Sequence, residues 1–314
     1  MLTIFTTAKP FVGRIGVNQR NALNSWIRLE PRPQVLLFGD EAGAAEVARE
    51  LGLQHIPHVQ RSTAGLPLLS DMFAQADALA KNPLLCYVDA DIVFMPNLIP
   101  ALQQSTDWTG LFLMVGCSHT LEQETALDFG TAAWQQDALA RSTPPAQNKR
   151  SAWGLDYFIF RKDAFAQFPP FVVGRPGWDN WFLYHVRRRG GHLIDATPVV
   201  TAIHQEHHFE YTARPQSEIW AGADGQANLK LVGGQAHLFS ALDMTHVLTP
   251  AGLRAVGGLL PLWRRLYTFP IRHPRVGFLR PLLDAPLWLT RPIRKRLRLN
   301  QSGMASGELK KRAT

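Results

Sequence analysis

The chain has 314 residues, of which 46% are hydrophobic and 18% are charged. This composition excludes a mostly disordered protein and suffices for one large domain, or for one domain with an appendage. The net charge of +8 is unevenly placed: residues 254–314 hold 14 Lys and Arg against two acids, which leaves 19 against 23 in residues 1–253. The positive excess therefore belongs to the C-terminal fifth.

In the first half of the chain, strand-like and helix-like segments alternate. Strands are predicted at 2–6, at 34–38, at 55–59 and from 84 into an Asp-Ala-Asp motif, with helices at 16–29, 41–51 and 67–80. This alternation predicts an α/β fold with a parallel sheet covered on both faces, in which ligands bind beyond the carboxyl ends of the strands. Thr6, Thr7, Asp40 and the motif at 89–91 all follow strands, so we expect them to line one crevice.

After residue 100 the alternation weakens. A strand is predicted at 110–115, a mixed polar segment at 119–150, a strand at 153–160, a helix up to 189 and a strand at 193–203. We expect a catalytic domain over 1–215 and a basic, amphipathic extension over 216–314. Prolines should limit the extension to short helices, and we expect its last 14 or so residues to be disordered.

Several features bear on location. The N-terminal residues show no signal-peptide pattern, and no apolar run reaches the ~18 residues of a spanning helix. The two cysteines, Cys86 and Cys117, lie in apolar runs and indicate neither a disulfide framework nor a thiolate metal site. We expect a cytoplasmic protein, either soluble or peripheral at the cytoplasmic face of the membrane.

Residues 84–94, LLCYVDADIVF, are the most informative stretch. Asp89 and Asp91 interrupt an apolar strand, and residues i and i+2 of an extended segment point the same way. Desolvated carboxylates need a cationic partner, and Mg²⁺ or Mn²⁺ takes carboxylate oxygens while also binding phosphates. The alternative is a pair of surface carboxylates at a strand end. The second strand-end acid, Asp40, favours the metal.

Three further groups carry candidate chemistry. In Gly-Trp-Asp-Asn-Trp at 177–181, Asp179 is either a base for an incoming hydroxyl or an acid that favours a helix N-terminus. Trp178 and Trp181 would offer flat faces to a sugar. Gly154 and Asp156, after Trp153, form either a sugar-binding or acceptor-binding group, or a tight turn into a strand.

The third group is the histidine cluster that follows a predicted strand. His204, His207 and His208 could form a separate zinc site, but their spacing matches no zinc pattern. We favour one imidazole joining the metal of the two aspartates. His204 is the first choice because it lies nearest the strand end, and His207 is the second.

Asp-Ala-Asp, Gly-Leu-Asp-Tyr-Phe at 154–158, Gly-Trp-Asp-Asn-Trp and Ile-His-Gln-Glu-His at 203–207 occur in this order. With them, residues 1–215 resemble nucleotide-diphospho-sugar transferases of the GT-A fold, which contain a D-x-D motif. The resemblance implies a Rossmann-like, mostly parallel sheet flanked by helices, and metal-dependent transfer of a sugar to a hydroxyl of a glycan or lipid-linked acceptor, as in polysaccharide biosynthesis.

The resemblance also assigns roles. Asp91 would bind Mn²⁺ or Mg²⁺ directly, Asp89 would contact the ribose or a metal-bound water, and His204 would complete the metal site. Asp179 would activate the acceptor, although Trp178 stands where inverting members often have Glu, which leaves the stereochemical outcome open. The positions of the strand ends add Thr6, Thr7, Asp40, Asp89 and Ala90 as donor-binding residues, with Lys9 or Arg61 near the phosphates.

Two other functions stay open. Asp-Ala-Asp-Ile-Val also fits the D-x-D-x-V pattern of haloacid-dehalogenase-type phosphatases, with Asp89 as nucleophile. That motif normally lies on a first strand, whereas about three strand–helix units precede it here, and no Gly-Asp-x-x-x-Asp follows. A nucleotide-sugar-binding module without turnover is the other alternative, and the set of Asp91, Asp179 and His204 argues against it.

The C-terminal region 254–298 holds eleven Arg and Lys against one acid, together with Trp, Phe and Leu. Short basic amphipathic segments of this kind fit an anionic membrane surface better than nucleic acid. The alternative is a solvated basic face whose apolar residues pack on the core. A membrane contact would suit an enzyme with a lipid-linked acceptor.

Overall fold

The computed structural model describes residues 1–104, 110–123, 125–131, 133–147, 154–206 and 216–279. The chain divides into two compact units, Met1–Pro261 and Leu262–Thr314. The boundary expected from the sequence, at 215, falls inside the first unit. Residues Trp153 and His207, and the expected disordered end of the chain, lie outside the described residues.

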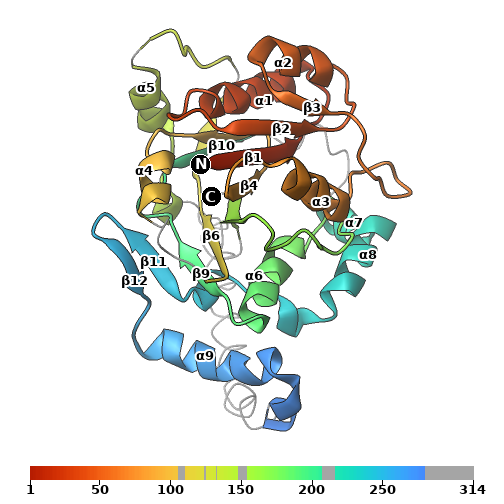
Figure 1. Ribbon diagram of the computed structural model, residues 1–314, viewed down its shortest axis with the longest axis vertical. Helices are drawn as coiled ribbons and strands as arrows, with labels where there is room; N and C mark the ends of the chain where they lie inside the picture. Colours follow the sequence, from red (N-terminus) through yellow and green to blue (C-terminus); the bar gives the residue numbers. More distant parts are fainter. Residues whose placement is uncertain (105–109, 124, 132, 148–153, 207–215, 280–314) are drawn as a thin grey trace, which may run out of the picture. The chain divides into compact units, whose positions relative to one another are not determined.

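A nine-stranded sheet forms the centre of the first unit, counted over the described residues (Figure 1). In spatial order its strands are β12 (Gly252–Ala255), β11 (His246–Thr249), β9 (His192–Asp195), β6 (Phe112–Gly116), β8 (Tyr157–Arg161), β4 (Leu84–Val88), β1 (Leu2–Thr7), β2 (Gln34–Phe38) and β3 (Gln54–Ile56). Neighbours pair in parallel, except that β8 is antiparallel to β4 and β6, and β12 to β11. The predicted mostly parallel α/β sheet is confirmed.

Helices cover both faces of this sheet. Alternate residues of a strand point to opposite faces, so Ile4 of β1 packs in one core cluster with Trp26 of α1 (Gly13–Trp26), whereas Phe5 meets Phe73 of α3 (Leu69–Leu79) with ring centroids 5.1 Å apart. The first face is also covered by α2 (Ala44–Leu51) and α4 (Leu98–Gln103), and the second by α6 (Trp178–Arg188). Figure 1 shows α1 and α2 on one side of β1 and β2, and α3 on the other.

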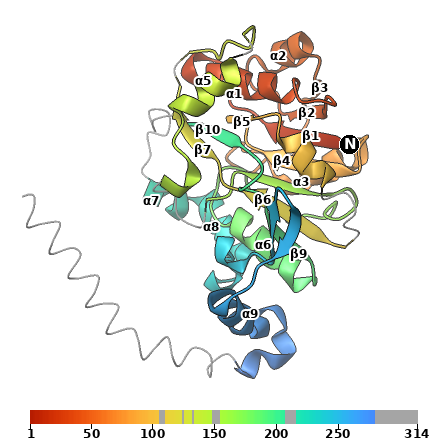
Figure 2. The same ribbon diagram turned by 90° about the vertical axis from the view of Figure 1, so that its left-hand side faces the viewer.

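A small second sheet lies beside the first and was not expected from the sequence. It consists of β5 (Ile92–Phe94), β10 (Ala202–Glu206) and β7 (His119–Glu122), with β10 in the middle (Figure 2). The Asp-Ala-Asp motif is the link between the two sheets, because β4 ends at Val88 and β5 begins at Ile92. Helix α1 fixes β5: Trp26 Nε1 donates to Ile92 O at 2.8 Å.

The remaining helices of the first unit are short. Among the described residues they are α5 (Trp134–Arg141), α7 (Gln216–Ala221), α8 (Ala223–Val232) and the 3₁₀ turns η1 (Pro145–Gln147), η3 (Gln235–His237) and η4 (Ala241–Asp243). Among the helices that the structure describes, none has the length and apolar content that crossing a bilayer requires.

Helix α9 (Leu259–Arg272) crosses the boundary between the units, and the turn η5 (Pro274–Leu279) follows it. The helix is longer than the short pieces expected from the prolines. Pro261 lies in its first turn, where a backbone N–H has no helical acceptor in any case, and Pro270 lies in its last turn.

Candidate functional site

A cavity of about 520 Å³ lies beyond the carboxyl ends of β1 and β4, where the alternating pattern predicted a crevice. Its walls come from the loop after β1, the first turns of α1, the link between β4 and β5, strand β10, and the loop before α6. The lining residues are Thr7, Ala8, Lys9, Pro10, Ile15, Asn18, Gln19, Glu41, Leu66, Pro67, Asp89, Ala90, Asp91, Val173, Gly174, Arg175, His204 and Ile219.

Asp91 and His204 meet at this cavity. The antiparallel pairing of β5 and β10 places His204 opposite Ile92, so the imidazole lies next to the acid that precedes β5. His204 Nε2 is 3.7 Å from Asp91 Oδ2, and both side chains are half-buried. Two of the side chains that the sequence proposed for the metal site therefore converge.

The fully buried side chain of Gln205 ties this pair together. Its Nε2 donates to Asp91 O at 3.0 Å and to Asn18 O at 2.8 Å, and its backbone N–H donates to Asp91 O at 3.2 Å. Its Oε1 accepts from Asn21 Nδ2 at 2.8 Å. Gln205 thus links the backbone of Asp91 to α1 and to the strand that carries His204.

Asp89 also lines the cavity and is accessible to solvent there. The protein around it nevertheless removes much of its hydration, and this desolvation, with the nearby charge of Asp91, raises the pKa of Asp89 to about 7. The Tyr87 hydroxyl donates to Asp89 Oδ1 at 3.2 Å and lowers the pKa in part, as does the charge of Lys9. A cation near this carboxyl would favour its charged form.

Asp156 and Asp179 form a second acidic group beside the cavity, without lining it. Ser118 donates to Asp156 Oδ2 through its backbone N–H at 2.8 Å and its hydroxyl at 2.6 Å. Desolvation raises the pKa of Asp179 to about 6, partly offset by the backbone N–H groups of Asp179 and Asn180, and the charge of Asp156 adds to the rise. The charge of Asp156 also raises the pKa of Asp89, so one acid influences both groups.

The start of α6 fixes the position of Asp179. Gly177, the residue before the helix, has φ of 93°, a left-handed conformation that favours glycine. Asp179 then lies in the first helical turn, as both interpretations of the sequence required. Desolvation raises the pKa of Asp179 by more than the backbone N–H groups of the helix lower it. The net shift is therefore opposite to that of an acid which only stabilises a helix N-terminus, whose pKa would be lowered.

The two tryptophans of this motif are packed in the core. Trp178 and Trp181 are only 8% and 9% exposed. The Trp178 ring meets Tyr87 at 5.3 Å, and Trp181 stacks on His185 with centroids 4.6 Å apart. This packing holds α6 against the sheet, and neither tryptophan lines the cavity, so the sugar-facing role expected of them stays a prediction.

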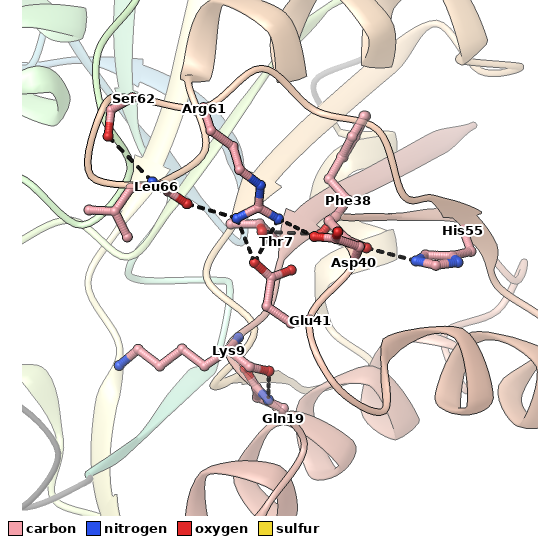
Figure 3. A network of polar contacts seen from close by, with 12 residues as sticks. Thr7, Lys9, Gln19, Phe38, Asp40, Glu41, His55, Arg61, Ser62 and Leu66 are labelled. Carbon is pink, nitrogen blue, oxygen red and sulfur yellow. Dashed lines mark hydrogen bonds and ion pairs between the residues drawn. The ribbon is translucent and has the colours of Figure 1, made fainter.

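The donor residues proposed at the end of β1 differ in their surroundings. Thr7 and Lys9 line the cavity, and the Gln19 side chain holds the Lys9 backbone by two hydrogen bonds, 2.6 and 2.9 Å long. Thr6 is fully buried, its hydroxyl donates to Thr7 O, and it does not line the cavity. The Lys9 ammonium points away from the neighbouring Arg61 network (Figure 3).

Arg61 and Asp40 are paired with each other and do not line the cavity. Arg61 Nη2 lies 2.5 Å from Asp40 Oδ1 and 3.0 Å from Glu41 Oε1, and Nη1 donates to Gly65 O at 2.8 Å (Figure 3). Two carboxylates already compensate the charge of Arg61, so the structure does not place it as a phosphate ligand. The pair instead braces the loop at 61–65 against the end of β2.

Sequence reasoning missed four polar residues of the cavity wall: Asn18, Gln19, Glu41 and Arg175. Arg175 follows Gly174 in a turn, where no periodic pattern marks its direction. Its Nη1 donates to Gly174 O, and within the described chain its charge meets no carboxylate. Gly154, proposed as a sugar contact, accepts a hydrogen bond from Cys117 Sγ and does not line the cavity.

The donor set of the cavity suits a hard divalent cation. Two carboxylates and one imidazole offer the oxygen and nitrogen ligands of Mn²⁺ and Mg²⁺ sites. In the part of the chain that the structure describes, no three His, Cys, Asp or Glu side chains form a ready-made metal cluster.

No protein-family model and no curated protein sequence matches this chain. Solved structures match with low sequence identity. GalNAc-T7 with UDP, GalNAc and Mn²⁺ has a TM-score of 0.50 at 18% identity, over 74% of this chain and 48% of that longer chain. The mannosyltransferase PcManGT from Pyrobaculum calidifontis, in complex with GDP-Man and Mn²⁺, scores 0.48 at 12% identity, over 97% and 80% of the two chains. Glucosyl-3-phosphoglycerate synthase of M. tuberculosis scores 0.41 at 13% identity, over 74% and 80%.

Likeness at this level of identity concerns the fold alone. It agrees with the mostly parallel sheet flanked by helices, and the chain has the GT-A fold that its motifs implied.

Proposed function

We propose that this protein with the GT-A fold is a metal-dependent glycosyltransferase. It would move a sugar from a nucleotide-diphosphate donor to a hydroxyl of a glycan or lipid-linked acceptor. One observation carries the proposal: Asp91 and His204 lie 3.7 Å apart in the same cavity as Asp89, at the carboxyl ends of the sheet. This is where α/β proteins bind their ligands. The neighbour GalNAc-T7 was solved with UDP, GalNAc and Mn²⁺, which supports the same ligand classes here.

Asp91 and His204 would hold Mn²⁺ or Mg²⁺, with Asp89 on the ribose or a water of the site. A cation bound there would neutralise charge that develops on the leaving diphosphate. Lys9 and Arg175 add positive charge to the wall of the cavity. Thr7 and Ala90 lie where they could contact the donor. The expected nucleoside role of Asp40 and the expected phosphate role of Arg61 have no support from the lining of the cavity.

Asp179 would act as the general base. With its pKa raised to about 6, its carboxylate is ionised at neutral pH and still basic enough to accept the proton of an acceptor hydroxyl. Ser118 orients Asp156 beside it, and Asp156 would hold a hydroxyl of the sugar or the acceptor. Both acids lie outside the wall of the donor cavity, as residues of an acceptor side would.

The phosphatase alternative loses support from the fold. It would require Asp89 as a nucleophile on a first strand, whereas Asp89 follows β4 in a sheet of the GT-A type. A binding module without turnover keeps the same fold. The raised pKa of Asp179, a group that donor binding alone does not need, favours an enzyme.

We also propose that the C-terminal region, 254–298, contacts an anionic membrane surface, which would suit a lipid-linked acceptor. The supporting observation is an exposed apolar set on α9, whose members are between 40% and 87% exposed: Leu259, Leu260, Leu262, Trp263, Leu266 and Phe269. Residues 259–279 contain four Arg and no acid. Apolar side chains with Arg and Trp on one short helix are typical of interfacial binding, and each basic residue near an anionic surface contributes about 1 kcal/mol.

A thermal-shift screen of nucleotide sugars and nucleoside diphosphates, with and without Mn²⁺, tests the enzyme proposal. Metal-dependent stabilisation of the wild type that is lost in Asp91→Ala is the expected result. Release of inorganic phosphate from simple phosphomonoesters would support the phosphatase instead. Stabilisation without transfer to any acceptor, and without hydrolysis of the donor, would support the binding module.

A further inference from the structure

Two asparagines on the same side of α1 have opposite hydrogen-bonding states. Asn18 and Asn21 are one helical turn apart and are 1% and 2% exposed. The Asn21 amide is satisfied: it donates to Gln205 Oε1 at 2.8 Å and accepts from the Leu127 backbone N–H at 2.9 Å. For Asn18, neither Nδ2 nor Oδ1 has a hydrogen-bond partner among the residues described.

Buried amides without partners are rare in folded proteins because the lost hydration is not replaced. Asn18 lines the cavity, so the missing partner can come from what the cavity binds. An amide offers one acceptor and two donor hydrogens and carries no charge. The uncharged Asn18 amide can donate a hydrogen bond to an anion while lying beside the two carboxylates Asp89 and Asp91.

Gln205 shows which end of the ligand Asn18 would meet. A single nitrogen, Gln205 Nε2, donates to the main-chain oxygens of both Asn18 and Asp91. Asn18 is therefore fixed next to the acid that we assign to the cation, at the metal side of the cavity. The ion pair of Asp40 and Arg61 lies at the end of β2 and does not line the cavity.

We propose that Asn18 is a ligand-contacting residue that donates through Nδ2 to a phosphate oxygen of the donor. The inference rests on the proposed function and adds a residue that determines affinity for the diphosphate. In the ligand-free protein the unpaired amide opposes folding, and the ligand relieves this cost when it binds. At position 18, the asparagine thus lowers the stability of the ligand-free protein and raises its affinity for the donor.

The test compares Asn18→Leu with the matched variant Asn21→Leu in the full-length protein. Leu has a similar volume and no polar atoms. Without ligand, Asn18→Leu should unfold at the same temperature as the wild type or higher, whereas Asn21→Leu should unfold lower because it leaves Gln205 Oε1 and the Leu127 N–H without partners. Affinity for UDP and GDP with Mn²⁺ is then measured by calorimetry, and affinity for uridine and guanosine by ligand-detected NMR.

For Asn18→Leu, affinity for whichever nucleoside diphosphate the wild type binds should fall on the order of tenfold to a hundredfold, the loss expected for a hydrogen bond to a charged group. Affinity for the nucleoside should stay unchanged. Asn18→Ser, a smaller replacement that is easier to accommodate, should lose diphosphate affinity in the same way.

Three results would overturn the inference and leave the proposed function standing. They are a fall in unfolding temperature as large as that of Asn21→Leu, wild-type affinity of both Asn18 variants for the diphosphate, and an equal loss for the nucleoside. A wild-type protein that binds no nucleoside diphosphate would overturn the proposed function itself, and the inference with it.

Discussion

His204 Nε2 lies 3.7 Å from Asp91 Oδ2, although the two residues belong to distant parts of the chain. A three-residue strand, β5, makes this possible by pairing with β10 directly after the Asp-Ala-Asp motif. Gln205 then holds the Asp91 backbone by two hydrogen bonds. The closeness of Asp91 and His204 thus depends on the small three-stranded sheet, which is separate from the central sheet.

Replacing His204 by Ala should weaken Mn²⁺ binding tenfold or more, because one of few protein ligands is lost. The measurement is an EPR titration of Mn²⁺ in the presence of a nucleoside diphosphate. His55→Ala is the control, since His55 Nε2 hydrogen-bonds Gly39 O and the residue does not line the cavity. Equal Mn²⁺ affinity of both variants would remove His204 from the site.

Replacing Gln205 by Leu should also weaken Mn²⁺ binding, by roughly tenfold to a hundredfold, because the Asp91 backbone loses a buried hydrogen bond that orients it. Gln205 acts here as a positioning residue. Asn24→Leu is a control on α1, since its Nδ2 bonds only to Arg20 O in the same helix among the contacts described. If Gln205→Leu lowered the unfolding temperature and left Mn²⁺ affinity unchanged, Gln205 would have a purely structural role.

Activity should depend on pH through Asp179. A general base must be ionised, so kcat/KM should fall as pH drops through about 6, the value to which desolvation raises the pKa of this carboxyl. Asp179→Asn should lower kcat by about 10²–10⁴-fold and leave donor affinity near that of the wild type. A pH profile of Asp179→Asn with the same acidic limb as the wild type would assign that limb to another group.

The same pKa predicts a gain in stability. A carboxyl whose pKa in the folded state lies above its ordinary value of 3.8 binds more protons in the folded state than in the unfolded state. Its charged form therefore destabilises the folded state, fully so at pH above about 6. This cost disappears as the pH falls below 3.8, where the carboxyl is protonated in both states. Asp179→Asn should therefore be more stable than the wild type at pH 8, by at most about 3 kcal/mol. The difference should shrink toward pH 4 in denaturant unfolding series, and a difference independent of pH would contradict the assignment.

The apolar set of α9 should be required for binding to anionic vesicles. We expect the triple variant Leu262→Ser, Leu266→Ser and Phe269→Ser to lose co-sedimentation with phosphatidylserine-containing liposomes at low salt, while the wild type binds. Leu242→Ser is the matched control, because Leu242 is 51% exposed but lies outside α9. Wild-type protein that stays in the supernatant at low salt would end the membrane proposal.

The sequence predicts most strands of the central sheet, because they are apolar runs separated by helical periodicity, as at Leu84–Val88. It does not predict β11 and β12, and it predicts one strand over 193–203, where β9 ends at Asp195 and β10 begins at Ala202 in the other sheet. It also predicts that Asp89, Asp91 and His204 share a site. It does not predict the small sheet, since β5 has three residues and its partner β10 lies far along the chain. The pairing of Asp40 with Arg61 and the burial of Trp181 depend equally on tertiary packing, which leaves no local pattern.

The most direct test of the central claim is the release of nucleoside diphosphate from nucleotide sugars, followed by chromatography with and without Mn²⁺. We predict release by the wild type that requires the metal, stops with EDTA, and is lost in Asp91→Asn. Release that persists without divalent cations, or in Asp91→Asn, would contradict metal-dependent sugar transfer at this site. So would a complete absence of release across UDP-linked and GDP-linked sugars.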